Sequence, residues 1–420
     1  MLNGRRVVIT GMGVVAPNGI GIDNFWNSLV HGRSGVRKIT RFDASSYPCQ
    51  VAAEVPDFDP TDYMSRQIAN RLGRFAQFSL AASQMAVGNA GMDFSKEDPH
   101  RMGVFIGTAI GGLDVFEMRH SIFMEKGLKR LSPFTAVSCS THSASGIISC
   151  EFNLRGPNTT IAAGCNSGMD AAYLAYNSIR FGDADLILAG ACEAPITPYM
   201  HGIFCVSGNL SRENREPQKA VKPYDLNADG MVLGEGGACI IVEALEHALN
   251  RNAKIYGEIV SYSALNEALD LFGVNADSGT MALNFIQALE RGYVDIKNID
   301  FISAHGNGIL SYDINETEAI KKTFGELAYH VPVASIKPVT GHAISVTATW
   351  QIIASLLAIE YGIIPPTINV QNPDPRCDLD YVTKGFIRKN LETVLINAHG
   401  FGGRLTTMII KKFLPERSYS

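Results

Sequence analysis

Charge is scarce in this sequence. Only 18% of its 420 residues are charged, against about 25% in an average globular protein, whereas 46% are hydrophobic. A chain of this composition folds around a large interior. The formal net charge is −5 and no long run of Lys or Arg occurs. We therefore expect neither nucleic acid nor an anionic membrane surface as a partner.

Long hydrophobic runs are also missing. One of the longest, residues 352–364, falls short of the roughly 18–20 residues that a membrane-spanning helix needs. The first residues enter a short apolar strand without the features of a secretory signal. These observations predict a soluble, cytoplasmic protein.

Paired cysteines are absent as well. None of the eight cysteines forms a Cys-x-x-Cys pair, and most lie inside apolar runs, where they pack as small hydrophobic residues. Cys139 and His142 have a spacing seen in metal sites, but no second pair accompanies them. The sequence therefore favours a reducing compartment and predicts no metal site.

Short apolar strands alternate with helical patterns along the whole chain. This alternation is typical of an α/β layered fold with a mainly parallel sheet. The pattern starts again near residue 250, which predicts two similar halves, 1–252 and 253–420. Helices are expected, among other places, at 22–32, 68–88, 136–150, 280–292, 314–324 and 342–361.

Residues 11–16, GMGVVA, match the dinucleotide-binding pattern G-x-G-x-x-A. Pro17 and Gly19 follow at once, where that pattern needs an uninterrupted helix. We interpret the stretch as a tight turn after the first strand. The alternative hypothesis, a nicotinamide-dependent oxidoreductase, depends on this segment alone.

Cys165 stands between small residues where a strand pattern becomes a helical one, in IAAGCNSGMDAAYLAYNSIRFG. Backbone N–H groups and the dipole at a helix N-terminus favour a thiolate, and hence a nucleophile. The alternative is that Cys165 merely fills space in the core.

Two histidines and a lysine follow apolar strands in the second half. His305 ends one strand in FISAHGNG, and Lys337 and His342 flank a turn in SIKPVTGH. Open α/β sheets bind ligands at the ends of their strands. Each histidine alone is more often structural, but the two together indicate a catalytic site.

The sequence resembles the β-ketoacyl-acyl carrier protein synthases, condensing enzymes of the thiolase-like superfamily, and is most similar to the synthase II type. The resemblance covers nearly the whole chain. It rests on segments that include VVITGMGVVAPNG, LRGPNTTIAAGCNSG, KPYDLNADGMVLGEGG, SIKPVTGH and NAHGFGG. It implies two related α/β halves in a five-layered α-β-α-β-α fold, and usually a homodimer.

The resemblance also implies roles for individual residues. Cys165 is the nucleophile, and its N–H group and that of Phe401 form the oxyanion hole. His305 and His342 are catalytic, while Lys337 and Glu316 support them; an ordinary structural ion pair is the alternative for these two. Further substrate-binding residues are Ile110, Phe204, Thr340, Phe401 and Asn307.

The implied reaction is the decarboxylative condensation of a malonyl thioester with an acyl chain held on Cys165. Both substrates arrive on the phosphopantetheine of an acyl carrier protein, and no metal or redox cofactor is required. The reaction belongs to fatty-acid or specialised lipid and polyketide biosynthesis. Thiolases use a second cysteine near the C-terminus, which NAHGFGG lacks. A catalytically weak partner subunit of a heterodimeric synthase, similar to a chain-length factor, remains the alternative, although such subunits lack the nucleophilic cysteine.

The sequence departs from the family pattern near the substrate. The departures are Asn307 and Ile309 for two threonines, Trp350 for a small or acidic residue, His399 for an aromatic residue, Arg404 for a threonine and Gly208 for an arginine. They suggest a substrate or carrier different from that of housekeeping fatty-acid synthesis.

The carrier protein is acidic, so the resemblance implies a basic patch on this protein that binds it. The alternative is that the basic residues simply lie on solvated helix faces. The candidates are Arg66, Arg71, Arg74, Lys126, Lys129 and Arg130.

Overall fold

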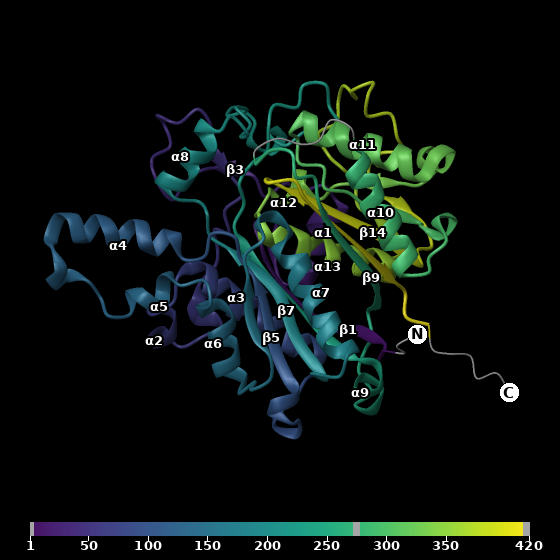
Figure 1. Ribbon diagram of the computed structural model, residues 1–420. Helices are drawn as coiled ribbons and strands as arrows, with labels where there is room; N and C mark the ends of the chain where they lie inside the picture. The colour runs from purple at the N-terminus through teal and green to yellow at the C-terminus, as the bar shows by residue number, and fades with distance from the viewer. Residues whose placement is uncertain (1–3, 272–277, 415–420) are drawn as a thin grey trace.

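The computed structural model describes residues 4–271 and 278–414 (Figure 1). Its centre is an eleven-stranded mixed sheet that consists of two five-stranded halves and one short extra strand. The N-terminal half contains β1 (Val7–Ala16), β5 (Met102–Gly107), β6 (Asn158–Ile161), β7 (Leu186–Glu193) and β8 (Gly236–Ala244). The C-terminal half contains β9 (Gly257–Asn266), β10 (Phe301–Ser303), β11 (Val333–Ala334), β14 (Thr393–Gly400) and β15 (Arg404–Lys411).

The two halves repeat one strand order. From the outer edge inward the N-terminal half runs β6-β5-β7-β8-β1, and the C-terminal half runs β11-β10-β14-β15-β9. In both, the outer three strands are parallel and the inner pairs are antiparallel. The prediction of two related α/β halves is confirmed. The prediction of a mainly parallel sheet holds within each half, where four of the five strands run in the same direction. The full sheet is mixed, because β8 and β15 run against both of their neighbours.

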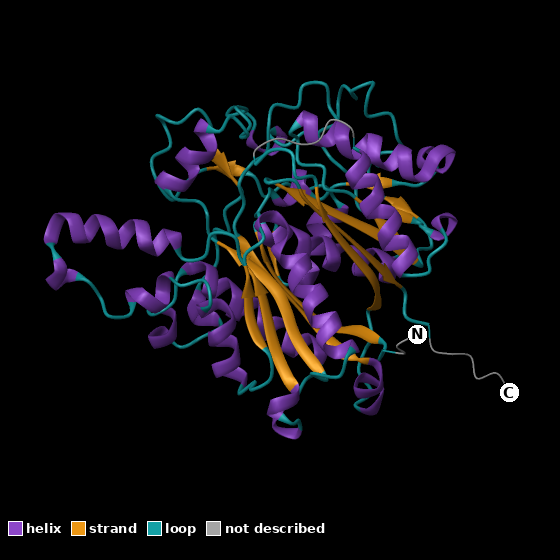
Figure 2. Ribbon diagram, in the orientation of Figure 1, coloured by secondary structure: helices purple, strands orange, loops and turns teal. Residues whose placement is uncertain are grey.

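Helices cover the sheet in layers (Figure 2). One layer, α3 and α6, packs on the outer face of the N-terminal half, and another, α10 and α11, packs on the C-terminal half. Between the two halves lie α7 and α13, which gives five layers in all. These helices are α3 (Arg74–Ala90), α6 (Ser143–Phe152), α7 (Ser167–Arg180), α10 (Gly279–Arg291), α11 (Leu310–Phe324) and α13 (Ser345–Tyr361).

The remaining elements are short or peripheral. The helices are α1 (Ile22–Val30), α2 (Arg66–Ala69), α4 (Leu113–Lys126), α5 (Thr135–Cys139), α8 (Pro198–Val206), α9 (Leu245–Asn250) and α12 (Lys337–Thr340). The strands are β2 (Gly19–Ile20) beside β1, β3 (Arg37–Lys38) with β4 (Val51–Ala52), and β12 (Ile363–Ile364) with β13 (Ile387–Arg388).

The glycines of the dinucleotide-like segment have a packing role. The segment is not a turn, because β1 continues through it to Ala16. A Cβ atom on Gly11 would lie 2.6 Å from the carbonyl oxygen of Ala86, and one on Gly13 would lie 2.0 Å from that of Ala82. The glycines thus allow α3 to approach the strand closely. The strand turns into β2, and α1 begins only at Ile22, so no helix starts directly after the pattern to receive a pyrophosphate. The structure therefore does not support dinucleotide binding here.

Two predicted helices are interrupted and four were missed. The helix expected at 68–88 is split into α2 and α3 at Gly73, and the one expected at 136–150 is split into α5 and α6. The four helices that were not predicted are α4, α8, α9 and α12. None of the side chains of α4 is buried, so the buried face that normally marks a helix in a sequence is absent there.

Candidate active site

Cys165 lies where the chain passes from β6 into α7. It occupies a 3₁₀ turn, Gly164–Asn166, that leads directly into the helix. The hydroxyl of Ser167 fixes this turn, because it accepts from the N–H of Ala163 at 2.8 Å and donates to the carbonyl of Gly164 at 2.7 Å. The half-buried cysteine therefore sits at the N-terminus of a central helix, as the sequence predicts.

Three hydrogen-bonding groups surround the Cys165 sulfur. Nε2 of His342 lies 3.3 Å from Sγ. The backbone N–H groups of Cys165 and Phe401 also face the sulfur. The end of β14 can come this close because residue 400 is glycine: a Cβ there would lie 3.2 Å from Sγ and 3.0 Å from the cysteine Cβ. Two N–H donors directed at one point can serve as an oxyanion hole.

The electrostatics of the resting site oppose a thiolate, contrary to the sequence-based prediction. Burial raises the pKa of the Cys165 thiol to about 11, and the carboxylate of Glu193 acts in the same direction. The ammonium group of Lys337 and the two backbone N–H groups lower the pKa but do not offset burial. The sulfur therefore keeps its proton at rest and needs a base to become a nucleophile.

His342 is placed to act as that base. Its pKa is held well below the usual value by burial, so the ring is neutral. Nδ1 lies 3.3 Å from the hydroxyl of Thr347, which also accepts from the N–H of Ala343 at 2.9 Å. A hydroxyl can donate to Nδ1 or accept from it, so both tautomers of His342 are satisfied. Nε2 can therefore accept the thiol proton or present an N–H group.

His305, in contrast to His342, is held in a single tautomer. The backbone N–H of His399 donates to its Nδ1 at 3.3 Å, and an N–H group can only donate. The proton of the neutral ring is therefore on Nε2, and burial keeps the pKa well below its usual value. Nδ2 of Asn307 lies 3.2 Å from Nε2, and the N–H of Ile309 orients that amide through its oxygen at 2.9 Å. Two donors thus converge, and one oxygen anion can accept from both.

Lys337 and Glu316 hold the main chain of His305. Nζ of Lys337 donates to the carbonyl of His305. Glu316 accepts from the N–H groups of His305 at 2.7 Å and Gly306 at 3.0 Å. Burial lowers the pKa of Lys337 to about 8, and Glu316 opposes that change. The pair thus supports His305 through its backbone, whereas the tautomer of the ring is set by the N–H group of His399.

The predicted substrate-binding residues fall into two groups. Ile110 and Phe204 are half-buried and pack in the same apolar cluster as Cys165, and the ring centroids of Phe204 and Phe401 lie 6.5 Å apart. Asn307 and Phe401 line the cavity at Cys165 directly. Thr340 does not: it is fully buried, and its hydroxyl bonds to the carbonyls of Ile336 and Gly341. Thr340 therefore lies outside this cavity, and its hydroxyl stabilises the turn before His342.

Two cavity residues were missed by the sequence analysis. Met231 and Tyr312 line the cavity together with Cys165, His305 and His342. Tyr312 stands four residues before Glu316 on α11, and this i, i+4 spacing was the one signal that could have identified it. No comparable signal marks Met231.

The cavity is almost closed. Its volume is about 10 Å³, which is roughly the space that one water molecule needs. An acyl chain can enter only if a side chain moves. Phe401 is the best placed to move, since it is 36% exposed at the end of β14.

The other departures from the family pattern have structural explanations. Trp350 is fully buried in α13, and a Cβ on Gly236 would lie 2.8 Å from its ring, so the bulky indole is accommodated by a glycine. Arg404 binds Asp170 of α7 at 2.8 Å. Gly208 has φ of +74° in an exposed turn after α8, which favours glycine.

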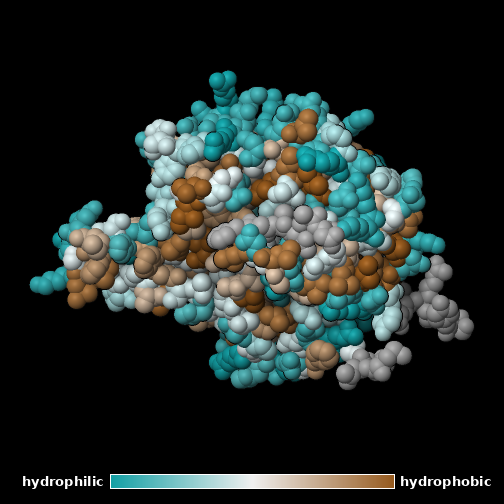
Figure 3. Space-filling model, turned by 45° about the horizontal axis from the view of Figure 1, so that its top comes forward, coloured by the Kyte–Doolittle hydropathy of each residue, from teal (hydrophilic) through white to brown (hydrophobic). Residues whose placement is uncertain are grey.

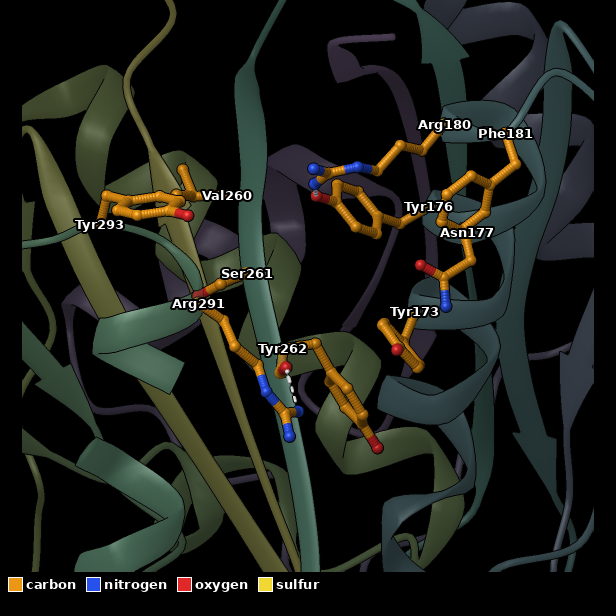
Figure 4. A pocket seen from close by; sticks show the side chains of 10 residues that line it. All are labelled: Tyr173, Tyr176, Asn177, Arg180, Phe181, Val260, Ser261, Tyr262, Arg291 and Tyr293. Atoms are coloured by element: carbon orange, nitrogen blue, oxygen red, sulfur yellow. Dashed lines mark hydrogen bonds between the residues drawn. The ribbon is translucent and has the colours of Figure 1, made fainter. Parts of the chain in front are cut away.

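A larger hollow lies outside this site. It has a volume of about 550 Å³ and is lined by aromatic rings and two arginines from α7, β9 and the end of α10 (Figure 4). The guanidinium of Arg180 lies over the ring of Tyr176, and Arg291 donates to the carbonyl of Tyr262 at 3.1 Å. The hollow contains none of the predicted catalytic residues.

Two kinds of feature are absent from residues 4–271 and 278–414. Within these ranges the structure contains no group of three or more His, Cys, Asp or Glu placed to hold a metal ion. Within the same ranges, no helix combines the length and the apolar character needed to cross a bilayer.

Sequence and structure comparisons agree on one family. The family description "Beta-ketoacyl synthase, N-terminal domain" matches residues 4–248, and "Beta-ketoacyl synthase, C-terminal domain" matches residues 256–371. The chain is 38% identical to 3-oxoacyl-[acyl-carrier-protein] synthase 2 of Coxiella burnetii, over 97% of this chain and 99% of the relative. It is also 38% identical to the putative polyketide beta-ketoacyl synthase 1 of Streptomyces halstedii, over 98% and 99%.

Solved structures give the same result. One match has a TM-score of 0.91 and 34% identity and covers 98% of this chain and 100% of that one. It comes from a complex described as a type II PKS acyl-carrier protein with its ketosynthase bound to the hexaketide. The ishigamide ketosynthase/chain length factor matches with a TM-score of 0.91 and 30% identity, over 98% and 100%.

Proposed function

We propose that Cys165, His305 and His342 catalyse the condensation reaction of this protein. The chain belongs to the beta-ketoacyl synthase family and is a condensing acyltransferase. The observation that supports these roles best is the convergence of all three side chains on one buried cavity. His342 Nε2 lies beside the sulfur, while Nε2 of His305 presents a donor. Enzymes of this family use no cofactor of their own, because their acyl groups arrive on the phosphopantetheine of a carrier protein.

In the first step the Cys165 sulfur attacks the carbonyl carbon of an acyl thioester. Its proton moves to Nε2 of His342, and the N–H groups of Cys165 and Phe401 stabilise the oxyanion. The C–S bond to the carrier breaks, and the departing pantetheine sulfur takes the proton from His342. The acyl chain is then bound to Cys165.

In the second step a malonyl thioester loses carbon dioxide, and the electron pair of the broken C–C bond moves into an enolate. The enolate oxygen accepts from Nε2–H of His305 and of His342. The carbanion carbon then attacks the acyl-Cys165 carbonyl and breaks its C–S bond. The sulfur takes up a proton, and the 3-oxoacyl product leaves on the carrier.

The direct test combines the purified enzyme with acyl-carrier and malonyl-carrier thioesters and analyses the products by mass spectrometry. We expect a 3-oxoacyl carrier two carbons longer than the acyl substrate, with one carbon dioxide released per product. Acylation without any product would favour a catalytically weak partner subunit, and no acylation at all would refute the role of Cys165.

We propose that the chain consists of an N-terminal ketosynthase half, 1–252, and a C-terminal half, 253–420. We also propose that the protein is cytoplasmic. The repeated strand order supports these boundaries, since β8 ends and β9 begins on either side of residue 252. Both fatty-acid and polyketide biosynthesis remain candidate pathways. The chain is 38% identical to a 3-oxoacyl-[acyl-carrier-protein] synthase 2 and also 38% identical to a putative polyketide beta-ketoacyl synthase.

An acyl carrier protein is the proposed partner, and five of the six candidate cations remain available to it. Arg66, Arg71, Lys126, Lys129 and Arg130 are exposed. Arg74 is excluded, because its guanidinium binds the buried Glu235 at 2.7 Å and donates to the carbonyl of Val55. Because the tip of α4 also carries exposed apolar residues, the basic surface proposed for the carrier is the α2–α3 connection with Arg66 and Arg71.

Arg71→Glu is expected to raise KM for carrier-bound substrate about five- to tenfold through charge repulsion, with kcat nearly unchanged. Hydrolysis of a small acyl thioester should stay the same, and Arg71→Lys should restore most of the affinity. Lys297→Glu, on the exposed surface of the C-terminal half, is the matched control. An unchanged KM for Arg71→Glu would remove this residue from the carrier interface.

A dimer with a second ketosynthase-like chain, most simply a homodimer, is proposed from two surfaces. The first surface is the free edge of β6, the last strand of the N-terminal half, whose one partner among the described strands is β5. The arm formed by α4 and α5 projects from the body (Figure 1) and carries apolar side chains on its surface (Figure 3). The exposed apolar residues of the arm are Phe116, Met118, Phe123, Met124, Leu128, Phe134 and Val137. A second copy would cover both surfaces.

Met124→Glu combined with Leu128→Glu is expected to shift the protein from dimer to monomer at micromolar concentration, because charges would enter an apolar interface. Light scattering after size-exclusion chromatography measures this shift. Leu249→Glu, at a comparably exposed position on α9, should leave the mass unchanged. A double variant that remains fully dimeric would place the interface elsewhere.

A further inference from the structure

Two polar atoms of the catalytic cavity have no hydrogen-bond partner among the described residues. They are the phenol oxygen of Tyr312 and Nε2 of His399. Both side chains line the cavity, and they are only 4% and 1% exposed. Buried polar groups are almost always paired, because leaving them unpaired is unfavourable. These two atoms therefore indicate a ligand group that the cavity is built to receive.

Both groups lie between the catalytic histidines and the movable Phe401. The ring of His399 stands edge-on to that of His305, with centroids 4.0 Å apart. The ring of Tyr312 is 5.0 Å from that of His399 and 6.3 Å from that of Phe401. A substrate on Cys165 therefore meets them close to its reacting end.

The charge state of the pair selects the kind of ligand atom. Burial raises the pKa of Tyr312, so the phenol stays protonated and can donate. Burial lowers the pKa of His399 to about 3, so its ring stays neutral. Neither group offers a positive charge to balance a carboxylate. A carbonyl or hydroxyl oxygen suits the pair better than the malonyl carboxylate does.

The position of that oxygen on the acyl chain follows from the rest of the site. The thioester oxygen on carbon 1 is bound by the N–H groups of Cys165 and Phe401. Tyr312 and His399 line the same small cavity as Cys165, so an oxygen that they bind lies within a few bonds of carbon 1. A chain extended by this reaction carries its newest oxygen on carbon 3.

We propose that Tyr312 and His399 form a subsite for an oxygen atom on carbon 3 of the acyl chain bound to Cys165. The enzyme then favours 3-oxoacyl or 3-hydroxyacyl thioesters over saturated ones, and it extends chains that have not been fully reduced. This inference rests on the condensing function proposed above and specifies its substrate class.

The test compares hexanoyl, 3-hydroxyhexanoyl and 3-oxohexanoyl carrier thioesters, with kcat/KM of condensation and acylation of Cys165 as readouts. Wild-type enzyme should prefer at least one oxygenated chain by roughly tenfold or more. Tyr312→Phe and His399→Phe should each reduce this preference about tenfold, measured as the ratio of kcat/KM for the oxygenated chain to kcat/KM for hexanoyl in the same variant. Tyr381→Phe is the matched control, because its buried hydroxyl binds Thr317 outside the cavity.

The outcomes separate this inference from the function on which it rests. Condensation of hexanoyl as efficiently as both oxygenated chains would overturn the subsite and leave the condensing function intact. The subsite would also be overturned if the two variants raised KM for the malonyl carrier equally with every acyl chain, since the groups would then bind the extender. Failure of all three chains to acylate Cys165 would refute the proposed function itself.

Discussion

Cys165→Ala is expected to abolish acylation of the enzyme and to lower the condensation rate by about 10⁴-fold or more. The sulfur is the group to which the acyl chain is bound in the proposed reaction, and no neighbouring side chain replaces it. Intact-protein mass spectrometry after mixing with acyl-carrier thioesters gives the readout: wild type gains one acyl group and the variant gains none. Decarboxylation of the malonyl carrier should continue, because it depends on the donors of His305 and His342.

Cys205→Ala provides the matched control for this experiment. Cys205 is also half-buried and packs in the same apolar cluster as Cys165. The variant removes the same atom from a neighbouring position without removing the nucleophile. Acylation of Cys205→Ala should therefore match wild type. An acyl adduct on Cys165→Ala would show that another residue is the nucleophile.

The sequence predicted the layers of the fold better than the details of the sheet. The alternation of strand and helix patterns identifies two α/β halves, because each element has its own hydrophobic period. The equal strand order of β6-β5-β7-β8-β1 and β11-β10-β14-β15-β9 was not visible, since strand pairing depends on long-range contacts that a linear pattern does not record. For the same reason, the reversed direction of β8 and β15 was not predicted.

Glycines show a second limit of sequence analysis. Gly11 and Gly13 were interpreted through the turn and loop conformations that glycine favours. In the structure they lie within β1, where the backbone of α3 leaves no space for a Cβ atom. Close approach between two elements leaves no periodic signal in either of them.

The candidate site was predicted through its resemblance to a family, and its electrostatics were not. The positions of Cys165, His305 and His342 follow from the matching motifs. The resting state of the thiol depends on burial by segments that are far apart in the sequence, and these raise the cysteine pKa instead of lowering it. The same holds for the tautomer of His305, which is set by a backbone N–H on β14.

Replacement of the two histidines should separate their roles. His305→Ala is expected to slow malonyl decarboxylation by about 10²–10³-fold, the usual effect of losing one donor to a developing oxyanion. Acylation of Cys165 should stay within a few-fold of wild type, because His305 contacts the enolate and not the sulfur. His342→Ala should slow both steps, since Nε2 of His342 lies 3.3 Å from Sγ.

The pH dependence of acylation tests whether His342 is a base. Without it, the sulfur reacts only through its thiolate fraction. Because the pKa of Cys165 is about 11, this fraction rises about tenfold per pH unit from pH 7 to 9. Acylation of His342→Ala should rise steeply, whereas wild type, in which a neutral His342 takes the proton, should rise much less. Lys337, whose pKa is about 8, loses its charge in both proteins over this range, so the comparison between them isolates His342. A flat profile for the variant would assign proton removal to another group.

Glutamine at each histidine position separates donation from proton transfer. Its side-chain amide can donate near the position of Nε2, but it does not take a proton at neutral pH. His305→Gln should therefore recover much of the decarboxylation that His305→Ala loses. His342→Gln should recover decarboxylation while acylation stays slow and pH-dependent. Recovery of acylation by His342→Gln would mean that this residue only orients the thiol, and the deprotonation step assigned to it would be wrong.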